Sequence, residues 1–276
     1  MAKNISPLIA HENEVQGLIA WSVLPTQILF YLSILIFLQQ SALGLNSLIR
    51  HGNILMATWQ LTLALAFLFL SLPVLQFSKL AKTYLISEDQ GRLALALRFL
   101  GVFWSCYRLV LIFSVAPLLA FLVRNFSGLD YQQIELKNVF SVSAALIALG
   151  IILFLIRESK ASTHKKTFTQ SVEIFANRNV VKIKVLTFFS VGIGLLWIGS
   201  YLGDALINTS LDNIGVAISG GAYLIIGVAL GFVWRATREI QRNPSLIYFE
   251  RTMEKINFFW LVSCVGFSII FMGNFC

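Results

Sequence analysis

The chain has 276 residues, of which 57% are hydrophobic and only 12% are charged, and its formal net charge is +8. A mean hydropathy of +0.79 excludes an ordinary soluble domain, in which about a quarter of the residues are charged, and predicts an all-α polytopic integral membrane protein. The positive charge is explained by the loops of such a protein, so no nucleic-acid partner is expected.

Seven apolar stretches recur along the chain, each long enough to cross a hydrocarbon layer of about 30 Å. The residues before the first stretch are polar and include acids, and no small-residue cleavage site follows it, so we expect an anchor and not a cleaved signal peptide. Two polar segments, "SEDQGR" from Ser87 and "QRNPS" from Gln241, are expected to form turns, and Gly91 and Asn243-Pro244 within them are expected to end the preceding helices. The predicted transmembrane helices cover residues 22–45, 54–78, 99–123, 139–156, 185–206, 214–236 and 257–274.

Basic residues alternate between the two sides of the predicted membrane. Of the 21 Lys and Arg, only Arg50, Arg124 and Lys137 lie on the side opposite the N-terminus, and Arg108 lies inside the third span. Because positive charge accumulates in short cytoplasmic loops, the N-terminus is predicted to be cytoplasmic and the C-terminus to lie on the opposite side. Four tryptophans near the cytoplasmic ends of their spans are expected at the membrane interface: Trp21, Trp104, Trp234 and Trp260.

A sequence echo at a fixed spacing suggests two three-helix units. Phe103-Trp104 in the third span matches Phe259-Trp260 in the seventh. Since an even number of spans separates equivalent helices, the units would form a parallel repeat about an axis along the membrane normal. The alternative is that interfacial aromatic and basic residues recur at any cytoplasmic boundary. The segments expected are 1–21 (N-terminal), 22–123 (first unit), 139–156 (linking helix), 157–184 (basic loop) and 185–276 (second unit).

This three-plus-one-plus-three plan resembles that of the SWEET sugar facilitators. Members of that family place the N-terminus outside and have prolines in equivalent helices of both halves. In this chain the N-terminus is predicted to be cytoplasmic, and Pro25 and Pro73 have no counterparts in the fifth and sixth spans. The chain is therefore not assigned to that family.

Residue types used in catalysis do not come together in the predicted spans. The histidines His11, His51 and His164 lie in three separate segments, and no Asp or Glu lies in the interior of a span. Acid–base and nucleophilic mechanisms need such groups in pairs, and metal sites need them in clusters. We therefore expect no enzyme, no metal and no cofactor, and we interpret Cys106 and Cys264 as packing residues.

Arg108 is the charged residue predicted to lie deepest, about 15 Å from the cytoplasmic end of its span. A guanidinium is always charged and costly to bury in lipid. Trp104 and Ser105 lie one turn back on the same helix face and Gly101 lies two turns back, which would leave room for a phosphate or carboxylate. Either the side chain extends to a lipid headgroup or to Glu254, or it forms an anion-binding position in a cavity between the units.

Further candidate residues concern a transport pathway and helix packing. Pro117 is expected to kink the third span, and Gln60 is expected to line the same pathway as Arg108. Glycines four residues apart in "GSYLG" and "GVALG" are expected to let helices approach closely, within the chain or alternatively at a dimer seam. These glycines are Gly199, Gly203, Gly227 and Gly231.

The basic loop and the net charge favour contact with lipid. Phe168, Val172 and Phe175 recur at helical spacing, typical of a short helix lying on an anionic leaflet, with a solvated linker as the alternative. The expected partners are anionic headgroups at the cytoplasmic face, and either further copies of the chain or other membrane subunits. Two functions remain: a facilitator or channel for a small, anionic solute, which the repeat favours, and a non-transporting scaffold, assembly or lipid-organising subunit.

Overall fold

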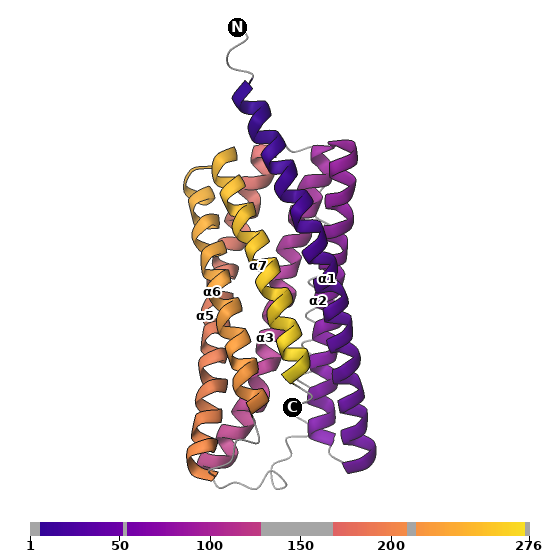
Figure 1. Cartoon of the computed structure of the whole chain (residues 1–276), viewed down its shortest axis with the longest axis vertical. Helices are drawn as coiled ribbons and strands as arrows, with labels where there is room; N and C mark the ends of the chain where they lie inside the picture. Colours follow the sequence, from indigo (N-terminus) through magenta and orange to yellow (C-terminus); the bar gives the residue numbers. More distant parts are fainter. Residues whose placement is uncertain (1–5, 52–53, 128–167, 209–213, 274–276) are drawn as a thin grey trace.

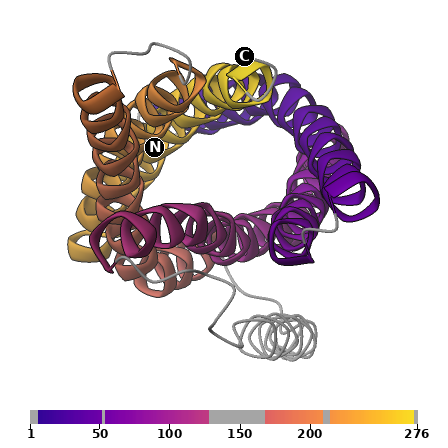
Figure 2. The same ribbon diagram turned by 90° about the horizontal axis from the view of Figure 1, so that it is seen from below.

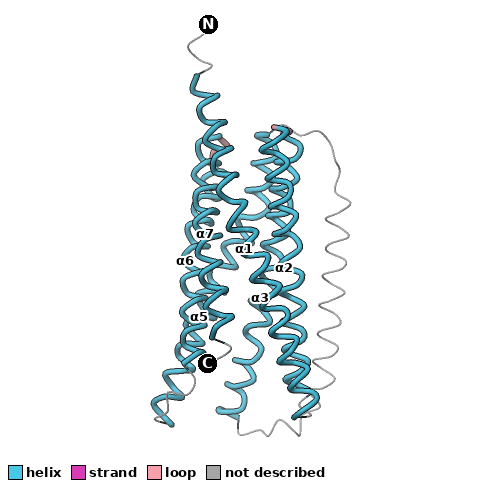
Figure 3. The backbone as a smooth tube through the Cα atoms, turned by 45° about the vertical axis from the view of Figure 1, so that its right-hand side comes forward, coloured by secondary structure: helices cyan, strands magenta, loops and turns pink. Residues whose placement is uncertain are grey.

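The computed structural model of the chain describes residues 6–51, 54–127, 168–208 and 214–273, and these form six helices with no strand. Each of the six is long and apolar enough to cross a membrane, and they stand side by side along the long axis of the molecule (Figures 1 and 3). The prediction of an all-helical fold is confirmed for the described residues, and the six apolar helices are compatible with a membrane protein. The helices are α1 (Ser6–His51), α2 (Ile54–Ser87), α3 (Gln90–Ser127), α5 (Phe168–Asn208), α6 (Ile214–Arg242) and α7 (Leu246–Gly273).

The six described helices run along the bundle in two opposite directions (Figure 1). α1, α3, α5 and α7 run one way, and α2 and α6 run the other way (Figure 1). The end at which α2 joins α3 and α6 joins α7 is called the turn end below. The predicted fourth span, residues 139–156, lies outside the described residues. The other six predicted spans each fall, to within one residue, inside one of the described helices.

At the turn end every described helix continues beyond its predicted span. α3 begins at Gln90 and α5 at Phe168, whereas their spans were predicted to begin at Phe99 and Val185. The stretch 168–184, predicted to belong to a loop, therefore forms the first turns of α5, where Val172 and Phe175 are only 2% and 4% exposed. α1 likewise begins inside the predicted N-terminal segment. Hydropathy locates the part of a helix that crosses hydrocarbon, whereas the helix itself continues into the polar layer.

Side-chain caps begin α3 and α7. The Asp89 carboxylate accepts a hydrogen bond from the backbone N–H of Gly91 at 2.8 Å, and Ser245 Oγ accepts one from the N–H of Tyr248 at 3.4 Å. Gly91 is thus in the first turn of α3, and the expectation that it ends α2 is wrong. α2 ends instead at Ser87, and the next residue, Glu88, has a left-handed φ of 53°.

The six helices form a closed ring in the order α1, α2, α3, α5, α6, α7, and each packs against the next (Figure 2). The outer surface of this ring carries many large apolar side chains, including Trp21, Tyr31 and Phe188, which are 69%, 65% and 62% exposed. Such a continuous apolar surface suits a protein surrounded by lipid.

Aromatic side chains from α3 and α7 meet inside the ring. The ring centroids of Phe103 and Trp260 lie 4.8 Å apart, those of Trp104 and Phe259 lie 5.1 Å apart, and the two indoles stack at 6.4 Å with an interplanar angle of 7°. All four side chains are at most 1% exposed. The expectation that Trp104 and Trp260 lie at the membrane interface is therefore wrong, because nearness to a helix end does not reveal which face of the helix carries the residue.

An asparagine links α7 to α1. Asn257 Nδ2 donates a hydrogen bond to the backbone carbonyl of Leu18 at 2.8 Å, in a partly buried position. Interhelical hydrogen bonds of this kind contribute about 0.6–1.7 kcal/mol within membranes. The Asn257→Ala variant is therefore expected to lose about 1 kcal/mol of unfolding free energy in detergent titrations. The exposed Asn177 provides the matched control, and an equal loss in Asn177→Ala would contradict the assignment.

Candidate functional site: two lateral grooves

Arg108 lies in a groove at the contact between α3 and α5 with an exposed side chain, and the buried Trp104 borders the same groove. Lys182 of α5 reaches the same place, and its Nζ donates a hydrogen bond to Ser105 Oγ at 3.2 Å. Two cationic side chains from different helices therefore share one groove, called the α3–α5 groove below. It has a volume of about 100 Å³ and is lined by Trp104, Ser105, Arg108, Val181, Lys182, Val185 and Leu186.

Trp104 and Ser105, two predicted neighbours of Arg108, both border the α3–α5 groove, as their position one turn back on α3 suggests, but the Trp104 ring is not paired with the Arg108 cation. The Trp104 indole stacks on Trp260, and the cation–π pairs of the described residues involve other cations, such as Lys184 over Trp234. No acidic residue within the described ranges forms an ion pair with Arg108, and the Arg92–Asp89 pair lies at the turn end.

Gly101 makes room for an asparagine of α5. A Cβ on Gly101 would lie 3.2 Å from Asn179 Nδ2, and this amide donates to the Phe175 carbonyl at 2.8 Å. The space above Gly101 is therefore filled by protein, and the expectation that it accommodates a phosphate or carboxylate is wrong.

Gln60 does not share a site with Arg108. Its Oε1 accepts a hydrogen bond from Ser47 Oγ at 3.0 Å, which ties α2 to α1. At 1.5 Å per residue, Gln60 lies about 41 Å from the turn end along α2, and Arg108 lies about 27 Å from it along α3. The two residues therefore differ in depth by about 13 Å. Pro117 falls within the bounds of α3, and its side chain lies outside those that the structure describes.

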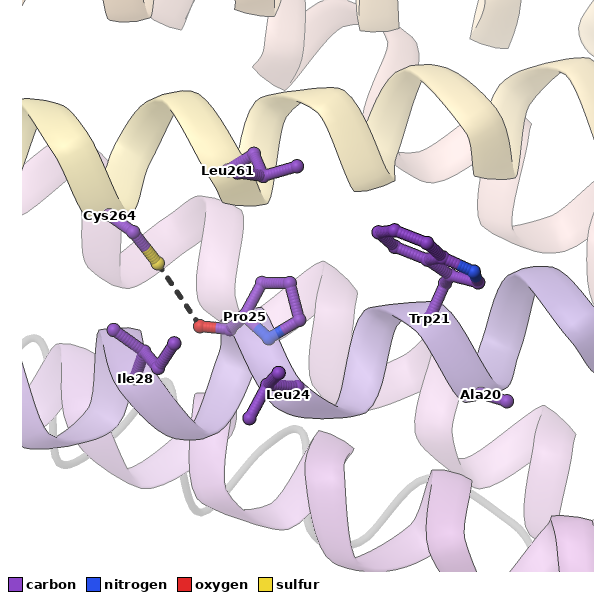
Figure 4. A pocket seen from close by; sticks show the side chains of 7 residues that line it. All are labelled: Ala20, Trp21, Leu24, Pro25, Ile28, Leu261 and Cys264. Atoms are coloured by element: carbon purple, nitrogen blue, oxygen red, sulfur yellow. Dashed lines mark hydrogen bonds between the residues drawn. The ribbon is translucent and has the colours of Figure 1, made fainter.

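A second groove lies between α1 and α7 (Figure 4). Its one hydrogen bond among the residues drawn runs from Cys264 Sγ to the Pro25 carbonyl at 3.2 Å, and the remaining lining is apolar. Sequence reasoning did not single out this groove and marked Cys264 only as a packing residue. It has a volume of about 460 Å³ and is lined by Ala20, Trp21, Leu24, Pro25, Ile28, Leu261 and Cys264.

Glycines bring α5 and α6 into close contact, although only some of them were expected to. A Cβ on Gly227 would lie 2.7 Å from Val191 Cγ2, and one on Gly231 would touch Thr187 Cγ2 at 3.6 Å. The closest approach of a glycine Cβ to the backbone of the other helix joins Gly194 of α5 to Gly220 of α6, which the four-residue spacing did not reveal. A Cβ on Gly199 would meet no described atom within 4 Å, and the environment of Gly203 lies outside the described side chains.

Lys182 is the groove residue that sequence reasoning missed. It lies in the stretch predicted as a basic loop, for which the sequence suggests either a short helix on an anionic leaflet or a solvated linker. The signal was present, because the helical spacing of Val172 and Phe175 continues through the buried Ile183 and Leu186. Following that period into the fifth span would have placed Lys182 on a helix flank beside the lipid-facing residues.

The α3–α5 groove presents two cationic side chains suited to an anion. A guanidinium and an ammonium provide charge-assisted donors for phosphate or carboxylate oxygens. The described residues hold no cluster of three His, Cys, Asp or Glu that could bind a metal ion. Comparison of the chain with protein-family models, curated proteins and solved structures finds no match, and the geometry of the two grooves is therefore the basis for a functional assignment.

Proposed function

We propose that the protein is a non-transporting membrane protein that organises lipid, or assembles with other membrane subunits, through its lateral surface. The observation that carries this proposal is the contrast between the inside and the outside of the ring. Inside, Phe103, Trp104, Phe259 and Trp260 pack against one another. Outside, Arg108 is exposed beside apolar side chains. A solute pathway along the ring axis would have to pass through the aromatic contacts.

The proposal includes two equivalent three-helix halves, and the helix bounds support it. The shift that carries Phe103 onto Phe259 also carries the start of α3 onto the start of α7, and the end of α2 to within one residue of the end of α6. The capping residues Asp89 and Ser245 are separated by the same interval. The helix contacts pair in the same way: α1–α2 with α5–α6, α2–α3 with α6–α7, and α7–α1 with α3–α5.

The pattern of burial also supports equivalent halves. The same shift pairs buried residues of α3 with buried residues of α7, and a shift one residue longer pairs those of α1 with those of α5. The pairs in α1 and α5 are Val15/Val172, Ile19/Ala176, Ser22/Asn179, Val23/Val180, Thr26/Ile183, Leu29/Leu186, Ser33/Ser190 and Ile36/Ile193. Those in α3 and α7 include Leu93/Phe249, Leu97/Met253, Leu100/Ile256, Phe103/Phe259, Trp104/Trp260 and Leu111/Phe267. Interfacial aromatics and basic helix ends alone would not produce this agreement.

The aromatic contacts are reciprocal, as a two-fold relation between the halves requires. Phe103 touches Trp260 and Trp104 touches Phe259, at centroid distances of 4.8 and 5.1 Å. In a two-fold contact residue i of one half meets residue j of the other, and j meets i. α3 and α5 run in the same direction (Figure 1), so the proposal includes one linking span between them, at residues 139–156. The distribution of basic residues supports an N-terminus in the cytoplasm.

A facilitator of a small anionic solute is the second candidate, and the two-half architecture favours it. The two functions differ in whether water reaches the middle of the ring. Ser263 of α7 is 1% exposed and lies one turn from both Phe259 and Phe267 on the same helix face. Ser87 is exposed at the turn end. Serine-to-cysteine replacements at these two positions are nearly isosteric and form a matched pair.

We expect a water-soluble maleimide to label Ser87→Cys and not Ser263→Cys in a chain whose native cysteines are replaced by alanine. Labelling of Ser263→Cys after denaturation in SDS shows that its thiol is intact. Comparable labelling rates at both positions in the folded protein, together with anion uptake by proteoliposomes, would overturn the non-transporting proposal in favour of the facilitator.

A further inference from the structure

The structure assigns the phosphate of an anionic phospholipid to the α3–α5 groove, held between Arg108 and Lys182. The inference deepens the proposed function, on which it rests, by naming the lipid class and the one groove that selects it. It is carried by a comparison of the two grooves of the ring, which lie at equivalent contacts and differ in charge.

Five of the seven lining positions correspond between the two grooves. On the shift that relates α3 to α7, Ser105 and Arg108 take the places of Leu261 and Cys264. On the shift that relates α1 to α5, three groove residues of α5 take the places of three groove residues of α1. The latter pairs are Val181/Leu24, Lys182/Pro25 and Val185/Ile28. Each half therefore builds the same groove, and the apolar groove in Figure 4 is an internal reference for the charged one.

Cations are concentrated at one groove only. Arg178 lies one turn before Lys182 on α5 and is exposed, and its counterpart on α1 is Trp21. Nearer the turn end, Arg98 of α3 has Glu254 of α7 as its counterpart. The α3–α5 contact thus carries a column of basic side chains, and the equivalent column at α1–α7 has a carboxylate, an indole, a proline and a thiol. Only the first column attracts an anion.

Arg108 and Lys182 lie farther from the turn end than three other basic residues of the bundle, at a depth that suits a phosphate pulled slightly into the hydrocarbon layer. Lys79, Arg98 and Lys255 lie eight or nine residues from the turns, about 12 Å from the turn end. By the same measure Lys182 lies about 21 Å and Arg108 about 27 Å from that end. α3 and α5 both start at the turn end, so their side chains lean toward it. The two cationic side chains can therefore extend from the hydrocarbon layer toward a headgroup phosphate at the turn end.

The apolar surroundings favour a lipid as the source of the phosphate. Val181 and Val185 border the groove and are 66% and 38% exposed on the lipid-facing side. A volume of about 100 Å³ suits a phosphate group and leaves the rest of the molecule outside. A lipid can lay its acyl chains along this exposed surface, whereas a free anion would have to leave water to reach it. In so apolar a place the attraction between phosphate and two cations is also much stronger than in water.

The test compares lipid retention by charge-matched variants. Full-length protein is equilibrated with mixed phosphatidylglycerol and phosphatidylcholine, and the lipid retained after detergent washing is counted by native mass spectrometry. We expect the unmodified protein to retain phosphatidylglycerol selectively. The Arg108→Gln/Lys182→Gln variant should bind it at least tenfold more weakly, and Arg238→Gln/Arg242→Gln, which loses two exposed cations elsewhere, should match the unmodified protein.

Two further measurements keep the inference falsifiable. The exchanged variant Arg108→Lys/Lys182→Arg keeps both charges and should retain the lipid, which separates loss of the site from misfolding. In the unmodified protein, brominated phosphatidylglycerol should quench tryptophan fluorescence more than brominated phosphatidylcholine, because Trp104 lines the groove. Equal retention by the Gln variant and its control, equal quenching by both lipids, or displacement of the lipid by millimolar inorganic phosphate would overturn the assignment. Labelling at Ser263→Cys with lipid selectivity intact would overturn only the non-transporting function.

Discussion

Replacing Phe259 by alanine is expected to lower the free energy of unfolding by about 2–3 kcal/mol. Phe259 is fully buried, and its ring lies 5.1 Å from that of Trp104 and 5.4 Å from that of Trp260. In a water-soluble core such a deletion costs about 3–5 kcal/mol, which includes the transfer of the ring from water. Within a membrane the transfer contribution is largely absent, whereas the lost packing remains, so the lower value is expected.

Phe258 provides the control for this prediction. It precedes Phe259 in the chain, is 48% exposed, and contacts Phe232 at a centroid distance of 6.2 Å on the outer surface. Phe258→Ala should change the unfolding free energy by less than about 1 kcal/mol. Titration of both variants with SDS, followed by tryptophan fluorescence, compares them directly. Equal stability of the two would show that the aromatic side chains inside the ring do not hold the halves together.

Replacing Gly194 by alanine is expected to cost about 1–3 kcal/mol and to separate α5 from α6. The added Cβ would lie 2.7 Å from the Gly220 carbonyl oxygen and 2.8 Å from the Leu224 backbone nitrogen. Backbone atoms cannot rotate out of the way as side-chain ends do, so the helices themselves must move. Small residues at such contacts are what allow membrane helices to approach closely.

The matched control for Gly194 is Gly192, half a turn earlier on the same helix. A Cβ on Gly192 meets no described atom within 4 Å. Gly192→Ala should therefore be neutral or stabilise the protein by up to about 1 kcal/mol, because alanine is the better helix former. Thermal unfolding in detergent measures both variants. A Gly194→Ala protein as stable as Gly192→Ala would contradict the close contact of α5 and α6.

The helical fold was predictable because hydropathy reports directly on the length of chain that must avoid water. Hydropathy could not reveal how far the helices continue at the turn end, because an amphipathic helix and a polar loop have similar composition. Nor could it distinguish Trp21, which is 69% exposed, from Trp104, which is fully buried. Both lie near the predicted cytoplasmic end of a span, Trp21 in α1 and Trp104 in α3, and the rotation of each helix in the bundle determines which of them is buried.

The sequence indicates which candidate residues share a face of one helix, but it does not indicate which residues of other helices lie beside them. Arg108, Trp104 and Ser105 share a groove because residues three and four apart lie on one helix face. Lys182 comes from α5 and became a neighbour of Ser105 only through the packing of α5 against α3. The same holds for Gln60, because its depth and its bond to Ser47 depend on how α1 and α2 pair.

The proposed equivalence of the two three-helix halves has a consequence for the number of copies of a site in each molecule. An assembly of identical three-helix subunits would repeat every residue, so a cation at one contact would appear at the other. In this chain the counterpart of Arg108 is Cys264, and the counterpart of Lys182 is Pro25. Of these two grooves only one is charged, so the proposed phospholipid is expected to occupy one position within the described helices, in a one-to-one stoichiometry.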